Sequence, residues 1–542
     1  MILESGDEHK KEHASRLPNR RYGYFRDDQI MFLLAHSANS EKDTKVQNFA
    51  ADINGKLEQL RVGTILKSPQ AISFPELTDE EIEQSKDFLS ADELEIAKRA
   101  FSIIKCDLEQ TPDDPAKLLK VVDELNNQHA QDPQAFAAEK KSAIQSTSPN
   151  WLVSVASQGA GTGGPGGRPS PYYGSRKNAP YHFDLVTKLK NNEIYGDGEG
   201  VDVVILDSAP SAQDLVAAYK EWPDHPLIPT LLGPEGKLHL YPASYEELLR
   251  LSCTSLNDHD YKMTDHGLFI AGIIHSIVPK AEIHLIEVLN QYGVGDLTSF
   301  IQGLQKVYSE NIYQRHRKLV INCSWMLEFP LDDLHTRHMD QIEDPDAEFE
   351  RAVRSFSKTD QATLVLLEAF FCRFYGLGRQ AIAAVGNDRR TGDEAPTPAR
   401  YPAALRRVTG VGALPKSLEK LPTGKYRTSV FSNLSESPDG RGVVTKGIVT
   451  LGGEEGDGNG VLGLYIGEFP DNSRNESKWA WWAGTSFATP ILTGAVASIL
   501  SRGENNITRT QDAIKKLYGT GVKLIIDAGA GKQEDALPVI QS

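Results

Sequence analysis

The second part of the sequence alternates short apolar runs with segments of helical pattern, and this alternation limits the possible folds more than any other feature. The runs are VVIL at 203–206, IHLIEVL at 283–289, LVINC at 319–323 and AIAAV at 381–385. Strands that are apolar along their whole length are typical of parallel sheets, which are buried on both faces. The pattern therefore predicts a doubly wound, mostly parallel α/β sheet whose functional site lies at the carboxyl ends of the strands.

The first part of the chain shows a different alternation, in which strand, helix and strand patterns follow one another twice. In its helical segments, apolar residues recur at the spacing of one helix face. Two successive β-α-β units predict a smaller, ferredoxin-like α+β domain. The expected strands cover residues 29–35, 62–66, 101–106 and 151–155, and the expected helices cover residues 45–60 and 114–127.

A Gly- and Pro-rich stretch, QGAGTGGPGGRPSPYYG at 158–174, separates these two patterns. Glycine and proline at this density do not build a packed core and are typical of a linker. We therefore predict an N-terminal α+β domain over residues 1–156, a linker over 157–180 and an α/β domain over 181–542.

The charge balance is acidic, since 74 Asp and Glu residues outnumber 58 Lys and Arg residues. This balance argues against nucleic acid and anionic membranes as partners, and no apolar run approaches the roughly 20 residues of a membrane-spanning helix. The charged N-terminal residues lack the pattern of a secretory signal peptide, so a cytoplasmic location is expected. The four cysteines, Cys106, Cys253, Cys323 and Cys372, form no C-x-x-C pair, and neither a zinc site nor a disulfide framework is expected.

Three polar residues stand where an α/β sheet of this kind presents functional groups. Asp207 directly follows the first apolar run, His266 begins an apolar helical segment, and Asn387 lies with Gly386 after the fourth run. A carboxylate, an imidazole and an amide in these places can orient a base, transfer a proton and stabilise an oxyanion. Each also has a structural interpretation: a cap or turn for Asp207, a packed histidine for His266 and a Gly-Asn turn for Asn387.

The segment GTSFATP at 484–490 is the most specific of the candidate motifs. Ser486 is expected just before or at the start of a helix over residues 487–500, where the helix N-terminus presents positive charge and N–H groups. Gly484 permits a substrate backbone to come close, and Pro490 is tolerated in a first helical turn. The structural alternative is a Ser/Thr cap followed by a packed helix of small residues.

Together these segments resemble the subtilisin-like serine proteases, the subtilases. The resemblance runs from about residue 198 to the C-terminus and includes the strand-Asp motif, the HG…AG helix, the GN turn, YPAA followed by VTGVGAL, and GTSFATP. It implies a catalytic triad of Asp207, His266 and Ser486, with Asn387 in the oxyanion hole and polypeptides as substrates. It implies no organic cofactor. Many subtilases bind structural calcium, for which the sequence shows no ligand set.

The N-terminal α+β domain resembles the inhibitory propeptides of subtilases. The resemblance implies that the sheet of this domain covers the protease and that its C-terminal tail lies along the substrate cleft. The last strand-like segment, SPNWLVSVAS, leads directly into the Gly-rich stretch. We therefore expect a serine endopeptidase that is made as a zymogen and restrained by its own N-terminal domain.

The substrate-binding strand departs from the usual subtilase pattern. It reads INCSWMLEF at 321–329, so that Trp325 and Met326 replace the small residues beside which a peptide normally lies. The resemblance indicates Ser324, Trp325 and Gly386 as substrate-binding residues, but the specificity pocket does not follow from the family.

Two other interpretations stay open. A catalytically silent subtilase-fold module that binds partners is compatible with the altered strand, although all four catalytic residue types are present. The sedolisins share the GTSxxxP segment, but they lack the catalytic histidine and have aspartate at the oxyanion position. His266 and Asn387 therefore disfavour the sedolisin class.

Overall fold

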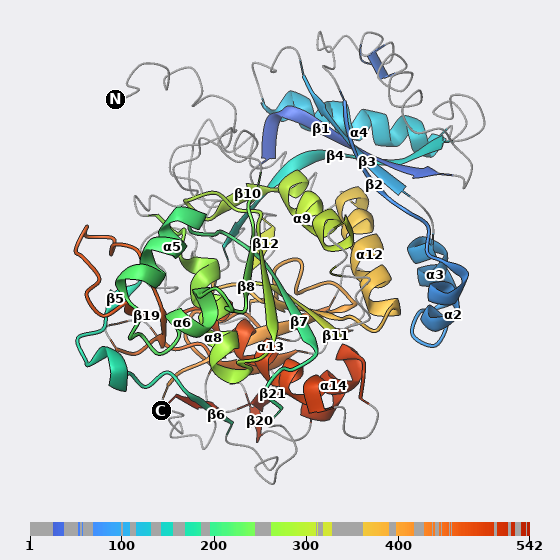
Figure 1. The fold of residues 1–542 in the computed structure, drawn as a ribbon. Helices are drawn as coiled ribbons and strands as arrows, with labels where there is room; N and C mark the ends of the chain where they lie inside the picture. The colour runs from blue at the N-terminus through green and yellow to red at the C-terminus, as the bar shows by residue number, and fades with distance from the viewer. Residues whose placement is uncertain are drawn as a thin grey trace, which may run out of the picture.

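Two sheets of different type organise the computed structural model of the chain (Figure 1). The larger sheet is mostly parallel and lies in the C-terminal part, and the smaller one is antiparallel and N-terminal. The described residues are 25–36, 53–54, 57, 69–98, 101–108, 115–131, 142–155, 168–185, 196–243, 262–309, 312, 318–327, 361–389, 397–416, 428–435, 437–438, 444–445, 447–454, 456, 458–502, 507–518, 522–525, 533–537 and 539–541.

Among these residues, nine strands form the larger sheet, in the order β20-β21-β17-β14-β13-β11-β7-β9-β8. All neighbours are parallel except β20 and β21. The predicted α/β sheet is confirmed, and its four apolar runs are β7, β9, β11 and β13. The bounds are β7 Val201–Asp207, β8 Leu238–Tyr241, β9 Glu282–Glu287, β11 Lys318–Cys323, β13 Ala381–Ala384, β14 Val408–Leu414, β17 Ile448–Leu451, β20 Val522–Ile525 and β21 Gln533–Leu537.

Helices cover this sheet, and two of them also connect it to the N-terminal part. α8 (His266–Ile277) and α13 (Thr485–Arg502) pack against each other and against β7. α9 (Leu297–Ser309) packs on β7 and β9 and also on the N-terminal sheet, and α12 (Gln361–Gly376) contacts both sheets. The remaining helices of this part are α5 Ala212–Glu221, α6 Ile228–Leu232 and α14 Thr510–Leu517, with a 3₁₀ turn at Arg176–Asn178.

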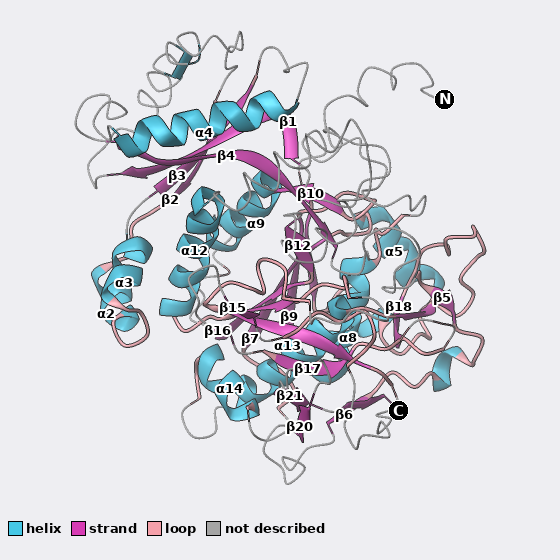
Figure 2. Cartoon of the chain, turned by 180° about the vertical axis from the view of Figure 1, so that it is seen from behind, coloured by secondary structure: helices cyan, strands magenta, loops and turns pink. Residues whose placement is uncertain are grey.

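The N-terminal sheet has the antiparallel order β4-β1-β3-β2, as expected for the ferredoxin-like arrangement. The described residues 53, 54 and 57 are helical and lie between β1 and β2, and α4 lies between β3 and β4 against the sheet (Figure 2). The bounds are β1 Phe25–His36, β2 Gln70–Phe74, β3 Phe101–Asp107, α4 Pro115–Gln131 and β4 Ser142–Val155.

The strand expected at residues 62–66 lies outside the described part of the chain. In the described part, β2 pairs with β3 at the edge of this sheet. Phe74 of β2 faces Phe101 of β3, with ring centroids 5.0 Å apart, and also contacts Phe370 of α12 at 4.7 Å. The aromatic side chain of Phe74 therefore joins β2 to both the sheet and the C-terminal part of the chain, a contact between distant segments that hydropathy along one strand does not reveal.

The acidic stretch that follows β2 folds into two short helices, α2 (Asp79–Ser85) and α3 (Ala91–Lys98), inserted before β3. Thr78 caps α2, since its hydroxyl accepts the N–H of Glu81 while the Glu81 carboxylate accepts the N–H of Thr78. The insert packs on α12 and not on the N-terminal sheet (Figure 1).

The end of β4 leaves its own sheet and pairs with two strands of the C-terminal part. β10 (Val294–Asp296) and β12 (Trp325–Leu327) both pair with it in antiparallel fashion. Residues 152–155, at the end of β4, therefore lie between β10 and β12 (Figure 2). β11 ends at Cys323 and β12 begins at Trp325.

Part of the predicted linker is packed. β5 (Ser170–Pro171) pairs with β19 (Trp479–Trp482), which also pairs with β18 (Val461–Leu464). Trp481 gives this segment a partner, since the ring of Tyr172 meets it edge-on at 5.9 Å. The remaining strands form two pairs, β6 Phe183–Leu185 with β22 Val539–Gln541, and β15 Ser437–Pro438 with β16 Val444–Thr445.

Within the described residues, no helix is long and apolar enough to cross a membrane. Cys106, Cys323 and Cys372 are buried free thiols, and Cys253 lies outside the described part of the chain.

Candidate active site

Asp207 and His266 form a buried pair where β7 ends and α8 begins. Nδ1 of His266 donates to Oδ1 of Asp207 at 2.7 Å, and both side chains are fully buried. The backbone N–H of Ser208 donates to the same carboxylate oxygen at 2.8 Å. Gly267 allows the start of α8 to lie close to the residues that follow β7, because a Cβ at this position would lie 2.2 Å from the carbonyl oxygen of Ser208. The sequence therefore brings a carboxylate and an imidazole together in fixed orientation.

The second imidazole nitrogen of His266, Nε2, does not take part in the pair with Asp207. Nε2 of His266 is buried and has no hydrogen-bond partner among the described residues. Buried polar atoms without a partner are rare in native proteins. The ring is held by Trp482, which meets it edge-on at 5.3 Å, and by Phe487 at 5.3 Å. Phe487 belongs to the first turn of α13, so the start of this helix lies beside the imidazole.

Ser486 is the second residue of α13, which begins at Thr485, two residues earlier than predicted. Pro490 consequently lies beyond the first turn, and because it has no N–H it cannot donate to the carbonyl of Ser486. The hydroxyl of Ser324 takes this place and donates to that carbonyl at 3.0 Å. In return, Oγ of Ser486 donates to the carbonyl of Ser324 at 3.2 Å. The residue is thus held through both its backbone and its side chain.

Asn387 lies in the turn after β13, next to the same helix start. Its side-chain oxygen accepts the N–H of Thr485 at 3.0 Å, which sets its NH₂ group on the opposite side of the amide. Gly386 has φ +101, and a Cβ there would lie 2.8 Å from Nδ2 of Asn433, so the turn requires glycine. The N–H of Gly386 donates to the hydroxyl of Thr485 at 3.3 Å.

A buried polar network that the sequence analysis missed supports this turn. Arg400 donates to both carboxylate oxygens of Asp388, at 3.0 and 2.7 Å, and Nδ2 of Asn433 donates to the same carboxylate at 2.7 Å. Asp388 is adjacent to Asn387 in sequence, but Arg400 and Asn433 come from other loops. Because no short motif contains all three residues, the spacing of residues in the sequence could not predict the network.

Residues 324–327 meet the N-terminal domain through their backbone. Trp325 pairs with Val155 and Met326 with Ser154, and the N–H of Val155 donates to the carbonyl of Gly293 at 3.0 Å. The indole of Trp325 turns away from this pairing and is buried against Phe300, with ring centroids 4.3 Å apart. The strand predicted to bind substrate is therefore occupied by the chain's own extended segment.

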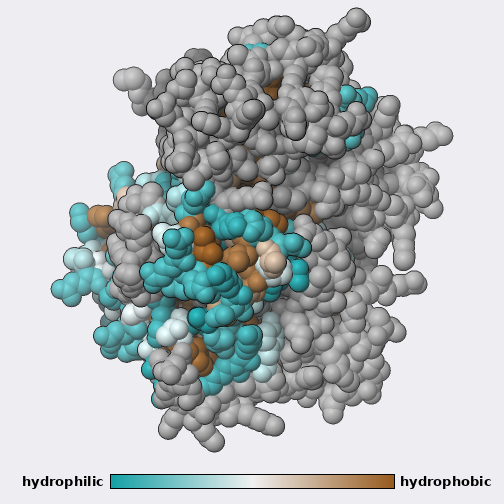
Figure 3. Space-filling view, turned by 90° about the vertical axis from the view of Figure 1, so that its right-hand side faces the viewer, coloured by the Kyte–Doolittle hydropathy of each residue, from teal (hydrophilic) through white to brown (hydrophobic). Residues whose placement is uncertain are grey.

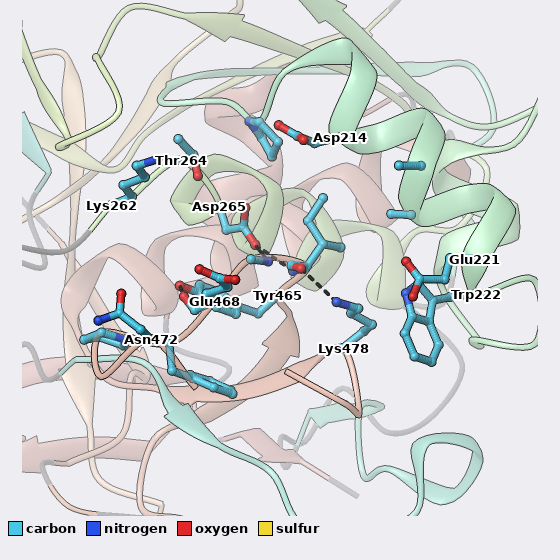
Figure 4. Close-up of a pocket in the computed structure, with 17 residues that line it drawn as sticks. Asp214, Glu221, Trp222, Lys262, Thr264, Asp265, Tyr465, Glu468, Asn472 and Lys478 are labelled. Atoms are coloured by element: carbon cyan, nitrogen blue, oxygen red, sulfur yellow. Dashed lines mark hydrogen bonds between the residues drawn. The ribbon is translucent and has the colours of Figure 1, made fainter. Parts of the chain in front are cut away.

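A pocket of about 500 Å³ lies beside Asp265, between α5, the start of α8 and the loop after β18 (Figure 4). Asp265, directly before His266, accepts the N–H groups of Ile466 and Gly467, each at 2.6 Å. Lys478 donates to the carbonyl of Ile466 at 3.0 Å. Asp265 thus ties this loop to the start of α8, where the candidate base His266 lies. Sequence analysis overlooked it, although it stands next to His266 in TDHG.

Burial raises the pKa of Asp265 to about 6, although the two N–H groups that it accepts act in the opposite direction. The neighbouring ammonium of Lys478 also lowers this pKa, but less than burial raises it. The charge of the Asp265 carboxyl group therefore changes at about pH 6.

Among the described residues, no group of three or more His, Cys, Asp and Glu side chains could hold a metal ion. The acidic segment Asp258-His259-Asp260 lies outside the described residues. A calcium site consequently stays unplaced.

The parallel sheet, the helix that starts beside a buried Asp-His pair and the serine at that start define a serine-type peptidase fold. The "Subtilase family" model matches residues 240–530, which is more than half of the chain. The match includes His266, Asn387 and Ser486, and Asp207 precedes it. The chain belongs to the subtilase family and is a serine-type peptidase.

Solved structures to which the chain is similar include a lanthipeptide protease, with 16% identity over 63% of this chain and 86% of that chain and a TM-score of 0.38. The prenylagaramide maturation protease PagA is 19% identical over 60% and 85% of the two chains, with a TM-score of 0.33. A cold adapted subtilisin-like serine proteinase is 16% identical over 64% and 92%, with a TM-score of 0.35. No curated protein matches the chain.

The raised pKa of Asp265 predicts a pH-dependent effect of Asp265→Asn. An Asp pKa of about 6 in the folded chain exceeds the unfolded value of about 3.9, so the stability contributed by this group is present below pH 4 and lost as pH rises through 6. Asn keeps an acceptor oxygen and does not titrate. The free energy of unfolding of the variant relative to wild type should therefore increase by about 2–3 kcal/mol between pH 4 and 7.

Denaturant titrations at several pH values measure this difference. Asp197→Asn is the control, because the Lys280 ammonium lowers the pKa of Asp197 and the sign should be reversed. A pH-independent difference for Asp265→Asn would contradict the assigned charge state.

Proposed function

We propose that the protein is a serine endopeptidase that uses Ser486, His266 and Asp207 as its triad. The observation that carries the proposal is the buried Asp207–His266 hydrogen bond, with Nε2 of the imidazole unpaired beside the start of α13. Asp207 accepts from Nδ1, so the neutral imidazole has its lone pair on Nε2 and can act as a base there.

In this mechanism, Oγ of Ser486 attacks the carbonyl carbon of a peptide bond while Nε2 of His266 takes the hydroxyl proton. Asp207 stabilises the imidazolium that forms. The NH₂ of Asn387 and the N–H of Ser486 bind the developing oxyanion, with the positive end of the α13 dipole behind them. His266 then gives its proton to the leaving amine, and water hydrolyses the acyl-enzyme.

We propose further that the N-terminal domain inhibits the enzyme by occupying its substrate cleft. The support is the position of residues 152–155, which pair with β10 on one side and β12 on the other. A peptide substrate that adds a strand to these same edges would compete for the same backbone groups. The domain stays linked to the protease, and linked segments reach effective concentrations in the millimolar range, so even weak pairing would block the cleft.

The register also suggests where the chain would be cut first. Val155, the last residue of β4, faces Trp325 in the antiparallel pairing, and Trp325 directly follows Ser324 in the sequence. Ser324 is the residue whose carbonyl accepts the Ser486 hydroxyl. We therefore expect the first cut in the Gly-rich segment that follows Val155, near Ser157 to Arg176.

Ser486→Ala and His266→Ala should each abolish peptidase activity without unfolding the protein, because each removes one participant in the proton transfer. A fluorophosphonate probe should label wild type at Ser486 and label neither variant. Turnover comparable to wild type in either variant would refute the triad. A folded chain that begins at Asn178 and neither reacts with the probe nor cleaves peptides would instead support the catalytically silent module.

Asn387→Ala should lower kcat by about 100–1000-fold with little change in KM, because the oxyanion exists only along the reaction path. Steady-state kinetics on a peptide substrate separate the two parameters. An effect confined to KM would remove Asn387 from the oxyanion role and make it a substrate-binding residue.

Residues 1–156, added in trans, should inhibit a chain that begins at Asn178, and the full-length protein should be less active until it is cut. A domain with Val155→Asp is the matched control, since it places a charge in a fully buried position beside Gly293 and should inhibit less. Inhibition is measured as an inhibition constant on a peptide substrate. A wild-type domain that neither inhibits nor assists folding would contradict the propeptide role.

A further inference from the structure

The helical insert of the N-terminal domain contacts the protease at a second place, apart from the cleft. α2 and α3 lie between β2 and β3 and rest on α12 and on the loop that precedes β14. Figure 3 shows the face on which they lie, at the right-hand side of Figure 1, where hydrophilic side chains surround a small hydrophobic area. The exposed side of the insert is thus mostly polar, and its apolar inner side is buried against α12.

An ion pair forms the centre of this contact. Nε and Nη2 of Arg407 donate to the two carboxylate oxygens of Glu93, at 2.9 and 2.7 Å, and Arg406 approaches the same carboxylate at 3.5 Å. Glu93 is 6% exposed. Burial acts to raise the pKa of Glu93, but the hydrogen bonds and charge of Arg407 outweigh it, so the pKa is lowered and the group is ionised. Such a pair is specific, because separating it leaves a buried charge without its partner.

Apolar and aromatic groups surround the ion pair. The insert contributes Leu77, Leu89 and Ala97, which cluster with Cys372 of α12. The guanidinium of Arg407 lies over the ring of Tyr375, 4.5 Å from its centroid, and completes the packing on the protease side.

Two further contacts extend this surface. Arg509, at the start of α14, lies 4.3 Å from the ring centroid of Phe88 in the insert. A Cβ at Gly376 would lie 2.7 Å from the hydroxyl of Ser85, so the glycine allows α2 to pack closely on the end of α12. Both sides of the contact are therefore shaped for each other.

We propose that the surface formed by α12, Arg407 and Arg509 is a second docking site for the N-terminal domain, with the α2–α3 insert as its occupant. The inference rests on the proposed inhibition of the cleft by β4 and adds how that inhibition is maintained. Two linked contacts bind more tightly than either alone, because the second forms at high effective concentration. After the chain is cut beyond β4, the insert keeps the domain on the enzyme and returns the cut strand to the cleft. Release of the insert then sets the rate of activation.

Cys372 reports directly on this contact. Its thiol is 5% exposed beneath the insert, and burial raises its pKa to about 12. Cys106 is buried in β3 of the N-terminal domain itself and serves as an internal standard for unfolding of that domain. A maleimide should therefore modify Cys372 only when the insert leaves, and Cys106 only when the domain unfolds.

The first experiment measures maleimide labelling of Cys372 by mass spectrometry in the full chain with Ser486→Ala, which keeps the chain uncut. Adding Glu93→Ala should accelerate labelling of Cys372 by at least about tenfold while Cys106 stays protected. Glu95→Ala is the matched control, because Glu95 lies on the exposed side of α3, where it pairs with Lys98, so its labelling should match the parent.

Equal labelling of Cys372 in the Glu93→Ala chain and in its control would overturn the proposal. If Glu93→Ala also exposes Cys106, Glu93→Gln, which preserves the size of the side chain, is measured in its place. Unchanged labelling of Cys372 in that variant overturns the proposal equally.

The second experiment follows the active full-length chain by size-exclusion chromatography and by peptide hydrolysis. In wild type, the cut domain should coelute with the protease. In Glu93→Ala, it should separate, and activity should appear at least about tenfold sooner. Labelling in the inactive chain is independent of catalysis, so failure of the proposed peptidase mechanism and failure of the second docking site give different results.

Discussion

Helix α13 is buried along almost its whole length, from Thr485 to Leu500, and the rest of the site depends on this burial. A helix that is apolar all round is stable only inside a protein, and here α8, α14 and several strands of the large sheet enclose it. Its enclosed position fixes its N-terminus among the loops at the carboxyl ends of β7, β11 and β13. Thr485 contacts the Gly386-Asn387 turn there, and Phe487 packs on the His266 ring. The arrangement of the candidate catalytic groups is therefore a consequence of how one helix is packed.

The sequence predicts those parts of the structure that local patterns encode. Continuous apolar runs predicted the parallel strands, and the GTSFATP segment predicted a serine at a helix start. The strand expected at residues 62–66 lies outside the described residues, whereas β2 at 70–74 pairs with β3 and brings Phe74 against Phe370, a contact that hydropathy along one segment does not reveal. The Arg400–Asp388–Asn433 network and Asp265 escaped prediction for a related reason. Their partners lie far away in the chain, and a buried charge becomes recognisable only with its partner in view.

The N-terminal domain meets the protease through three kinds of contact, and each has a different physical character. Its sheet packs on α9 and α12 through aromatic groups, such as Phe74 against Phe370. The end of β4 contributes backbone pairing, which depends little on side-chain identity. The α2–α3 insert contributes a buried ion pair, which is demanding in geometry. Cutting the chain beyond β4 would remove none of these contacts, so under the proposed inhibition a cut and a loss of inhibition would be separate events.

Ser324 connects the strand proposed to bind substrate to Ser486, the proposed nucleophile. Pro490 lacks the N–H that would bond the carbonyl of Ser486 within the helix, and the hydroxyl of Ser324 replaces it. Ser324 in turn receives a hydrogen bond from Nδ2 of Asn322 at the end of β11. The backbone of Ser486 is thus held by the sheet and only partly by its own helix. The next residue, Trp325, pairs with β4. If a substrate peptide takes the place of β4, as proposed, correct pairing would stabilise the same segment that holds the proposed nucleophile. Substrate binding and alignment of Ser486 would then be coupled through two consecutive residues, and a poorly paired peptide would lose both.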